Sequence, residues 1–385
     1  MNKILDNNQV KGIKESCYTA VLQPLTINQI TVPNRIVFPA IHTNYANTDG
    51  TVSTKLIDFY SKIAEGGCGL IFTGSAVVSK DGVGSNRIMR ADSDGCIDGL
   101  RKLFAAIEKH GSIPCIQLSH PGRQALKSVT GYDLLAPSDI NCPVMSKIDP
   151  TYQLKVMSLD DITRVKNDFV DAAKRAAEAG AKIIEIHAAH GYLLAEFLSP
   201  YANHRTDQYG NSVENRCRIV SEIVNEIRNQ LQDQIAISVR ISGDEFVKNG
   251  LTPTDYQQIA PLLEAAGADM LHVSVGVAES TDHIIPNASF QEAPFIAITE
   301  SIKKIATVPV CTVAGISSLD VAEKIIASGK ADLVAMGRAQ VADPELVKKT
   351  LTGGKNQITK CIHCNKCLYW ATGETEMHCA INSHL

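Results

Sequence analysis

The chain has 385 residues, of which 44% are hydrophobic and 20% charged, and its formal net charge at pH 7 is −4. This length and apolar share suit one large domain with an extensive core, and the weak negative charge argues against nucleic acid or a membrane surface as a partner. No apolar run reaches the roughly 18 residues of a membrane-spanning helix, and the first residues, MNKILDNNQVKGIKES, have no apolar signal core, so we expect a cytoplasmic protein.

The predicted elements begin after a polar amino-terminal arm, residues 1–20. From residue 21 to residue 355, short β-branched runs alternate with stretches that have the amphipathic period of a helix. The predicted strands are, in chain order, 35–41, 70–78, 114–120, 183–190, 235–242, 270–276, 308–316 and 333–339. Apolar runs of this kind are typical of parallel strands that are buried on both faces.

Helical patterns lie between these strands, for example at 54–67, 98–111 and 160–181. Several of them end on glycine, as AAEAG (176–180) does, where a left-handed residue would close the helix. Eight strands that are each followed by a helix predict an α/β fold of the (β/α)8 type, a TIM barrel. A doubly wound sheet is the alternative, but eight regular units favour a closed barrel.

One predicted connection is unusually long. Residues 121–157 separate the third strand from its helix, and loops of this length in compact domains are usually functional or disordered. Because this loop follows the carboxyl end of a strand, we expect it to overhang the mouth of the active site.

Residues that could bind a cofactor occupy the strand ends, where barrels of this type concentrate their chemistry. Arg240 lies in a predicted strand, and a buried guanidinium needs an anionic or electron-rich partner. A reduced flavin carries negative charge near N1 and C2=O, and the amide of Gln117 can both donate and accept along a pyrimidine edge. At the last two strands, VAGI and MGRA combine glycine amides with Arg338, which is typical of a barrel phosphate site.

A set of motifs identifies a family. The segments PNRIVFPAIHTNYA, IQLSHPGR, EIHAAHGYLLAEFLSPYANHRTDQYGNSVENR, VRIS and MGRA together resemble the Old Yellow Enzyme family of flavin oxidoreductases. Within that family the chain is most similar to the catalytic barrels of 2,4-dienoyl-CoA reductase and trimethylamine dehydrogenase. The resemblance covers residues 20–385, and its most specific part is HRTDQYGNSVENR, in which Asn211 replaces a frequent second glycine.

The resemblance implies a bound FMN, with NAD(P)H as co-substrate. It also implies an ene-reductase that passes hydride to the C=C bond of an activated alkene such as an enone, an enal or an enoyl compound. His187 and His190 match the pair that binds the acceptor's oxygen and stabilises enolate charge, and Tyr192 matches the proton donor to the α carbon. Structural polar groups are the alternative interpretation of these three residues.

The cofactor site that we expect from the strand ends and the resemblance together consists of Pro39, Ala40, Ile41, His42, Gly74, Gln117, Arg240, Ala314, Gly315, Gly337 and Arg338. His42 stands where the family often has Thr or Cys, which leaves the redox potential and the substrate preference open.

A cysteine-rich tail, residues 356–385, carries Cys361, Cys364, Cys367 and Cys379 in the spacing C-x2-C-x2-C-x11-C. Four thiolates at this spacing suit a [4Fe–4S] cluster; zinc is the less frequent occupant, and a metal-free motif is a further alternative. In multidomain relatives a similar motif follows the barrel and holds a cluster. No nucleotide-binding domain follows the motif in this sequence, so we expect no internal electron source for a cluster.

Two other functions remain open at this point. One is a flavin and iron–sulfur amine dehydrogenase, although a cationic amine would need an aromatic or acidic cage. The other is an electron-transfer barrel that depends on a separate reductase partner. For the ene-reductase the partner is a small electron-poor alkene. The sequence does not distinguish NADH from NADPH and leaves open whether the chain forms a homo-oligomer.

Overall fold

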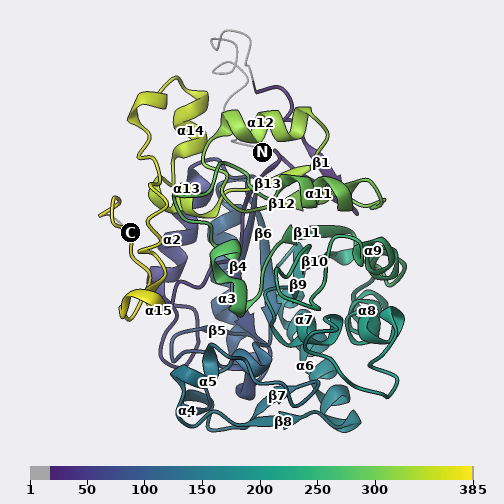
Figure 1. Cartoon of the computed structure of the whole chain (residues 1–385). Coiled ribbons are helices and arrows are strands. Elements are labelled where there is room, and N and C mark those ends of the chain that lie inside the picture. The colour runs from purple at the N-terminus through teal and green to yellow at the C-terminus, as the bar shows by residue number, and fades with distance from the viewer. Residues whose placement is uncertain (1–17, 384–385) are drawn as a thin grey trace.

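Eight parallel strands form a closed barrel in the computed structural model, which describes residues 18–383 (Figure 1). Most of the predicted arm, residues 1–17, therefore lies outside the described residues. Around the barrel the strands follow one another as β3 (Ile36–Phe38), β13 (Leu333–Ala335), β12 (Val310–Thr312), β11 (Met270–Ser274), β10 (Ala236–Ser242), β9 (Ile183–Ala188), β6 (Ile113–Ser119) and β4 (Leu70–Val77). Pairing between β3 and β4 closes the ring, and the predicted (β/α)8 barrel is confirmed.

The observed strands are shorter than the apolar runs that predicted them. The run 308–316 contains β12, which ends at Thr312, because Ala314 and Gly315 adopt left-handed φ values of 92° and 66°. Left-handed residues turn the chain out of the sheet. The residues after the last strand pair therefore belong to the loops at the barrel mouth.

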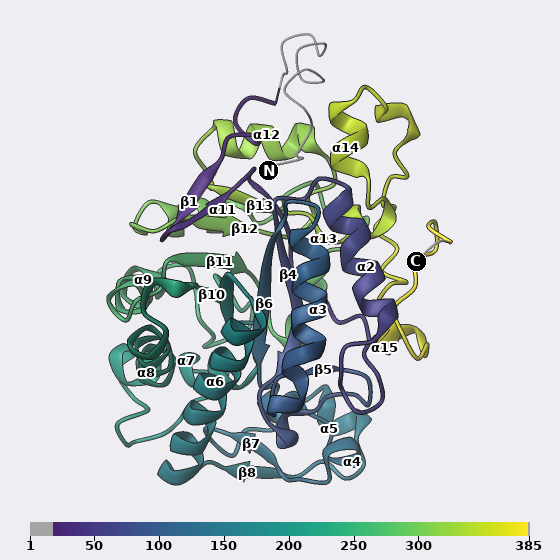
Figure 2. The ribbon, with the colours of Figure 1, turned by 180° about the vertical axis from the view of Figure 1, so that it is seen from behind.

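Helices cover the outside of the barrel, and Figure 2 shows α2, α3 and α6 side by side. The main helices are α2 (Thr54–Glu65), α3 (Ile97–Glu108), α6 (Leu159–Ala179), α8 (Val213–Leu231), α9 (Tyr256–Ala265), α11 (Ile296–Lys303), α12 (Leu319–Ala327), α13 (Gly337–Ala342) and α14 (Leu346–Leu351). Helix α6 starts with a capping box between Ser158 and Asp161 and ends at Gly180 with φ 106°, so the predicted glycine terminus is confirmed.

The shorter elements connect these helices and strands. They are β5 (Met89–Arg90), α7 (Leu193–Leu198), α10 (Thr281–Ile284) and the 3-10 turns η1 (Lys80–Gly82), η2 (Asp94–Cys96), η4 (Gln232–Gln234) and η5 (Ala278–Ser280). Among the described helices none is long and apolar enough to cross a membrane.

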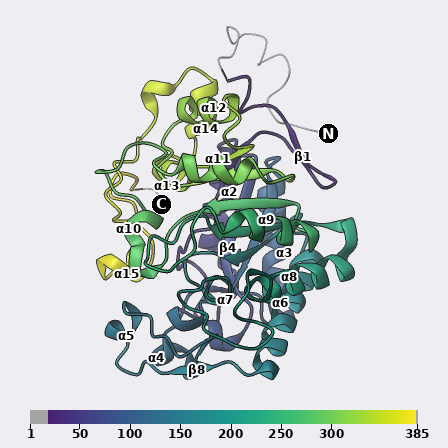
Figure 3. The same ribbon diagram turned by 45° about the vertical axis from the view of Figure 1, so that its right-hand side comes forward.

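The core has two compartments. The larger one lies between the strands and the surrounding helices, and the smaller one fills the barrel interior at its amino end. A hairpin of β1 (Leu25–Ile27) and β2 (Ile30–Val32) closes this amino end with the buried side chains of Ile27 and Val32. Figure 3 shows β1 at one end of the molecule and α4, α5 and β8 at the other.

The long connection 121–157 is folded. It contains η3 (Gly122–Gln124), α4 (Lys127–Thr130), β7 (Leu134–Ala136), α5 (Met145–Ile148) and β8 (Leu154–Val156), and β7 pairs with β8 in parallel. The buried Arg123 anchors it, because its Nη1 donates to Ile140 O and Asn141 O at 3.2 Å and its Nη2 meets Glu279 Oε1 at 3.1 Å. This segment is called the lid below.

The carboxyl-terminal tail contains η6 (Lys355–Gln357) and α15 (Tyr369–Thr372) and lies along the first strand–helix loop (Figure 1, yellow). The backbone N–H of Met377 donates to Thr43 O at 2.9 Å, and the Tyr45 hydroxyl donates to Met377 O at 2.6 Å. The tail therefore packs against residues about 330 positions earlier in the chain, next to the barrel mouth.

Candidate active site at the barrel mouth

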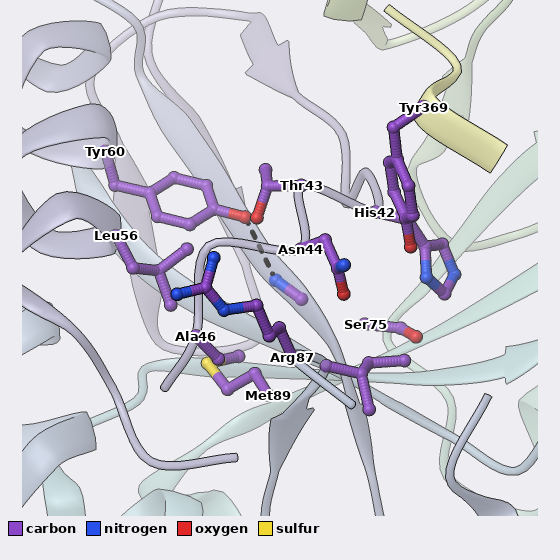
Figure 4. Close-up of a pocket in the computed structure, with 12 residues that line it drawn as sticks. His42, Thr43, Asn44, Ala46, Leu56, Tyr60, Ser75, Arg87, Met89 and Tyr369 are labelled. Carbon is purple, nitrogen blue, oxygen red and sulfur yellow. Dashed lines mark hydrogen bonds between the residues drawn. The ribbon is translucent and has the colours of Figure 1, made fainter. Parts of the chain in front are cut away.

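A cavity of about 440 Å³ opens at the carboxyl ends of the strands. Every residue predicted for the cofactor except Gly74 lines it, and so do His187, His190 and Tyr192. Gly74 lines a smaller neighbouring cavity, where its N–H donates to the Tyr60 hydroxyl at 3.1 Å (Figure 4). Lid residues such as Val144 and Ile148 also line the large cavity, so the expected overhang of the lid is confirmed.

The side chains reach the cavity because alternate residues of a strand point to the same face. On β9, Ile183 belongs to the apolar interior, and His187 lines the cavity four residues later. The parallel register pairs His187 with Arg240 of β10, and Arg240 with His272 of β11. Neighbouring strands thus bring their polar residues to the same level of the barrel.

A buried polar network lies beneath the cavity. The Gln117 amide donates to Glu185 Oε1 at 2.7 Å, and Glu185 Oε2 accepts from Ser238 Oγ at 2.9 Å and lies 2.8 Å from His272 Nδ1. Burial opposes ionisation of Glu185, but His272 and Arg240 outweigh it and lower the pKa of this carboxyl. Glu185 is therefore a buried carboxylate that compensates the charge of Arg240.

Sequence reasoning predicted Gln117 and Arg240 but missed Glu185, Ser238 and His272. The signal was present in the runs IIEIHA, ISVRIS and MLHVS, because each places polar residues at a period of two inside an apolar strand.

The segment between His187 and Tyr192 turns sharply. His190 and Gly191 have left-handed φ values of 60° and 69°, and a Cβ on Gly191 would lie 3.1 Å from Gln124 Nε2 and from Val277 Cβ. Gln124 belongs to the lid, and its amide stabilises this turn by donating to His190 O at 2.8 Å. Tyr192 then becomes the N-cap of α7, with its ring at the cavity.

The two histidines contact each other and two serines. His187 Nε2 lies 2.9 Å from His190 Nδ1, while the far nitrogens lie 3.1 Å from Ser119 Oγ and 2.7 Å from Ser274 Oγ. Burial, then the neighbouring histidine and Arg240, lower the pKa of His187 well below its usual value, and burial and Arg240 lower that of His190. Both imidazoles are therefore neutral at neutral pH.

Tyr192 lies against His187 and His42. Its ring stands edge-on to His187 with the centroids 4.7 Å apart, and its hydroxyl lies 3.4 Å from His42 Nε2. Burial raises the pKa of Tyr192 to about 12, while burial and Arg240 lower the pKa of His42 to about 4. The phenol is thus protonated and His42 is neutral at neutral pH.

The opposite part of the cavity has the predicted phosphate residues. Gly337 starts α13, and a Cβ there would lie 3.1 Å from Pro39 Cγ. Arg338 Nη1 donates to Pro286 O at 2.8 Å and to Asn365 Oδ1 of the tail at 2.5 Å. The sequence did not indicate this contact with the tail.

The residues at this mouth fit FMN. The buried Arg240 Nε has no hydrogen-bond partner within residues 18–383, so the guanidinium retains a donor beside the cavity. The cavity volume lies within the range of about 300–1,000 Å³ that is usual for cofactor sites. The cavity wall is apolar and carries one amide and one guanidinium, which suits the ring system of the flavin. The glycine backbone beside Arg338 suits its phosphate.

The four tail cysteines are free thiols, and Cys364 is exposed. Across the described part of the chain, no group of three or more His, Cys, Asp or Glu side chains is arranged to hold a metal ion. Thiolate charge on Cys361, Cys367 and Cys364 would favour the charged form of Arg338, although burial lowers its pKa overall. Metal binding by these cysteines stays a prediction.

The closed barrel gathers these residues at the carboxyl ends of its strands, where enzymes of the (β/α)8 class have their active sites. The chain belongs to the NADH:flavin oxidoreductase / NADH oxidase family, which residues 20–357 match. This membership confirms the resemblance found in the motifs. The description of this family names a flavin and NADH, which supports FMN as cofactor and a nicotinamide as co-substrate.

Individual relatives differ in length. The chain is 40% identical over 341 residues to an NADH oxidase of Thermoanaerobacter brockii, with 88% of this chain and 52% of the relative covered. It is 37% identical to an NADPH dehydrogenase of Bacillus pumilus, with 86% and 94% covered. A solved complex of 2-naphthoyl-CoA reductase with 2-naphthoyl-CoA has a TM-score of 0.89 at 29% identity, with 95% and 57% covered. The chain thus spans about half the length of the first and third of these proteins.

Proposed function

We propose that this chain is an ene-reductase, which reduces the C=C bond of an activated alkene with electrons from NADH or NADPH. The observation that carries the proposal is the row Ser119–His187–His190–Ser274 beside the Tyr192 phenol. In the proposed site Gln117 and Arg240 hold the flavin ring of FMN, and Gly315, Gly337 and Arg338 hold its phosphate. Bound and reduced FMN supplies the hydride.

The two serines determine which ring nitrogens carry protons. If Ser119 and Ser274 donate their hydroxyl protons, the facing atoms His187 Nε2 and His190 Nδ1 both carry N–H groups. Two N–H donors 2.9 Å apart repel each other, and an acceptor beside both of them relieves this repulsion. The oxygen of an enone or enal is such an acceptor. The N–H groups stabilise the negative charge that develops on this oxygen during hydride addition.

Tyr192 completes the reaction as the proton donor. Its pKa of about 12 keeps the hydroxyl protonated at neutral pH, so that it can donate to the α carbon of the developing enolate. The same side chain lies next to His187, and an acceptor held by the histidines therefore has its α carbon near the phenol.

The body of the acceptor is expected to be apolar. The outer part of the cavity is formed by the lid residues Leu126, Val144, Met145 and Ile148 together with Ile284 of α10. Val144 and Ile148 are exposed there, at 37% and 61%. An apolar substrate would bury these side chains, which favours acceptors with a ring or chain beyond the reacting C=C bond.

Amine oxidation is less well supported by this cavity. A carboxylate in the cavity would favour a cationic amine, and within the described residues no Asp or Glu lines it. A barrel that depends on a separate reductase is also less well supported. This chain covers 94% of the length of the relative named NADPH dehydrogenase, so that relative has little beyond the barrel.

Stopped-flow measurement of the two half-reactions tests the proposal. Wild-type protein loaded with FMN should be reduced by NADH or NADPH and reoxidised by 2-cyclohexen-1-one. Tyr192→Phe keeps the ring and removes only the acid, so reduction should persist while reoxidation slows by about 10²-fold. Absence of enone reduction by the wild type, or reoxidation of Tyr192→Phe at the wild-type rate, would contradict the proposal.

The tail cysteines are proposed separately as a metal site. Analysis of anaerobically purified protein should find about four irons per chain for a [4Fe–4S] cluster, whereas one zinc per chain or no metal would reject the cluster.

A further inference from the structure

Tyr192 requires a source of protons. Once the proposed reaction has taken its proton, the phenol is left as a phenolate in a largely buried position, and another turnover needs the proton back. The Tyr192 hydroxyl lies 3.4 Å from His42 Nε2, within hydrogen-bond reach. His42 also meets the Tyr192 ring edge-on, with the centroids 6.3 Å apart and the planes at 87°. His42 is therefore placed to exchange a proton with the phenol.

A second, smaller cavity adjoins the large one, and His42 lines both. Its volume of about 10 Å³ is close to the minimum that holds one water molecule. His42, Ser75, Arg87 and Tyr369 are among its lining residues, and Figure 4 shows His42 between Tyr369 and Ser75. The buried Ser75 Oγ has no hydrogen-bond partner among the described residues, so a water molecule there would satisfy a polar atom.

This small cavity reaches toward solvent. The side chain of Arg87, which forms part of its wall, is 42% exposed and pairs with Glu376 of the tail at 3.3 Å. The cavity is thus bordered both by the half-exposed Arg87 and by His42, whose ring in turn contacts Tyr192.

We infer that His42 is a proton relay that returns a proton from solvent to Tyr192 through the small cavity. The inference rests on the proposed function, in which Tyr192 protonates the alkene. The Tyr192 O–H bond breaks as the new C–H bond forms at the α carbon. The phenolate oxygen then takes the proton of His42 Nε2–H, and a proton from solvent replaces it on the ring. One proton enters from solvent for each proton that the product gains.

The protonation chemistry of the His42 imidazole suits this role. A neutral imidazole has one N–H donor and one acceptor nitrogen, so it can give a proton at one nitrogen and receive a proton at the other. The pKa of about 4 keeps His42 neutral at neutral pH, so that it does not place a lasting positive charge beside Arg240. The competing interpretation is that His42 only packs against the Tyr192 ring.

Two substitutions separate the relay from packing. His42→Phe keeps a ring of similar size without a transferable proton, and His42→Ala leaves room for free imidazole. With 2-cyclohexen-1-one as acceptor, both should slow steady-state turnover by about 10–10²-fold, below the full loss of a general acid, because each new cycle needs Tyr192 to be protonated again. Added imidazole should restore a large part of the rate to His42→Ala and none to His42→Phe.

Proton uptake gives a readout that is independent of turnover. A pH-indicator dye should report uptake together with flavin reoxidation in the wild type, and uptake that lags behind reoxidation in His42→Ala. His110→Ala is the matched control, because His110 contacts Ser61 at 3.2 Å and does not line either cavity. This control should keep the wild-type rate and should not respond to imidazole.

The outcomes distinguish the two proposals. If the wild type reduces the enone and Tyr192→Phe is slow, but both His42 variants keep the wild-type rate and proton uptake, the relay is wrong and the proposed function stands. Slow His42 variants that imidazole does not restore, with uptake still synchronous, would assign His42 to packing. If the wild type does not reduce the enone, both proposals fail.

Discussion

At the amino end of the barrel interior, Ile183 of β9 and Met270 of β11 are buried among other apolar side chains beneath the β1–β2 hairpin. Two residues further along the same strands, Glu185 and His272 are equally buried, but they contact each other at 2.8 Å. The apolar end gains free energy from burial alone, whereas the polar end is stable only if its groups find partners. The same strands thus supply a stable base and, two residues later, a reactive mouth.

The largest expected effect is at the apolar end. Leu70→Ala removes a fully buried side chain from the barrel interior and should lower the free energy of unfolding by about 2–5 kcal/mol. Urea denaturation measures this. Leu159→Ala, at a position that is 49% exposed, is the control and should change stability by no more than about 0.5 kcal/mol. Equal losses in both variants would mean that the interior is not the stabilising region.

At the polar end, substitutions should change the rate of alkene reduction more than the stability. His187→Ala and His190→Ala should each slow alkene reduction by roughly 10²–10³-fold, because each removes a donor to the developing oxyanion. The unfolding free energy should fall less than for Leu70→Ala. A rate within about threefold of the wild type, in stopped-flow reoxidation by an enone, would reject the role of the histidine pair.

The carboxyl group of Glu196, which contacts Arg123 of the lid, should make the free energy of unfolding depend on pH. Burial raises the pKa of Glu196 to about 8, although Arg123 opposes the shift, and the carboxyl accepts from Arg123 N at 3.0 Å. Because the folded pKa lies above the unfolded value, the folded state binds more protons, and its extra stability is lost as pH rises from about 4.5 to about 8.

Glu196→Gln removes this titration. Relative to the variant, the wild type should lose up to about 1.4 kcal/mol of unfolding free energy per pH unit within that window. Urea denaturation at several pH values measures the slopes. Glu226→Gln, on the exposed surface of α8, should keep the wild-type slope, and a Glu196→Gln slope equal to that of the wild type would contradict the prediction.

The smallest effect concerns the tail. Asn365 Oδ1 accepts from Arg338, so Asn365→Ala should weaken FMN binding by roughly fivefold, which corresponds to about 1 kcal/mol for one hydrogen bond. Fluorescence titration measures the affinity. Riboflavin, which lacks the phosphate, is the control ligand and should bind both proteins alike. An equal loss for both ligands would show that Asn365 does not act through the phosphate.

Much of the site was predictable from residue types at strand ends. His187 and Arg240 lie in strands whose apolar period is visible in the sequence, His190 and Tyr192 follow the first of these strands, and all four line the cavity. The contact partners were not predictable in the same way. Ser274, for instance, lies 84 positions after His190, and only the folded barrel brings the two side chains within 2.7 Å.

The sequence alone determined the barrel, the order of its strands and the chemical type of its mouth, because periodicity and strand-end residues are local properties of the chain. The tertiary structure decided what those residues touch. It placed Asn365 of the tail on Arg338, and it placed His42 between Tyr192 and a water-sized cavity. Such contacts depend on how distant segments pack together, and packing is a property of the whole fold.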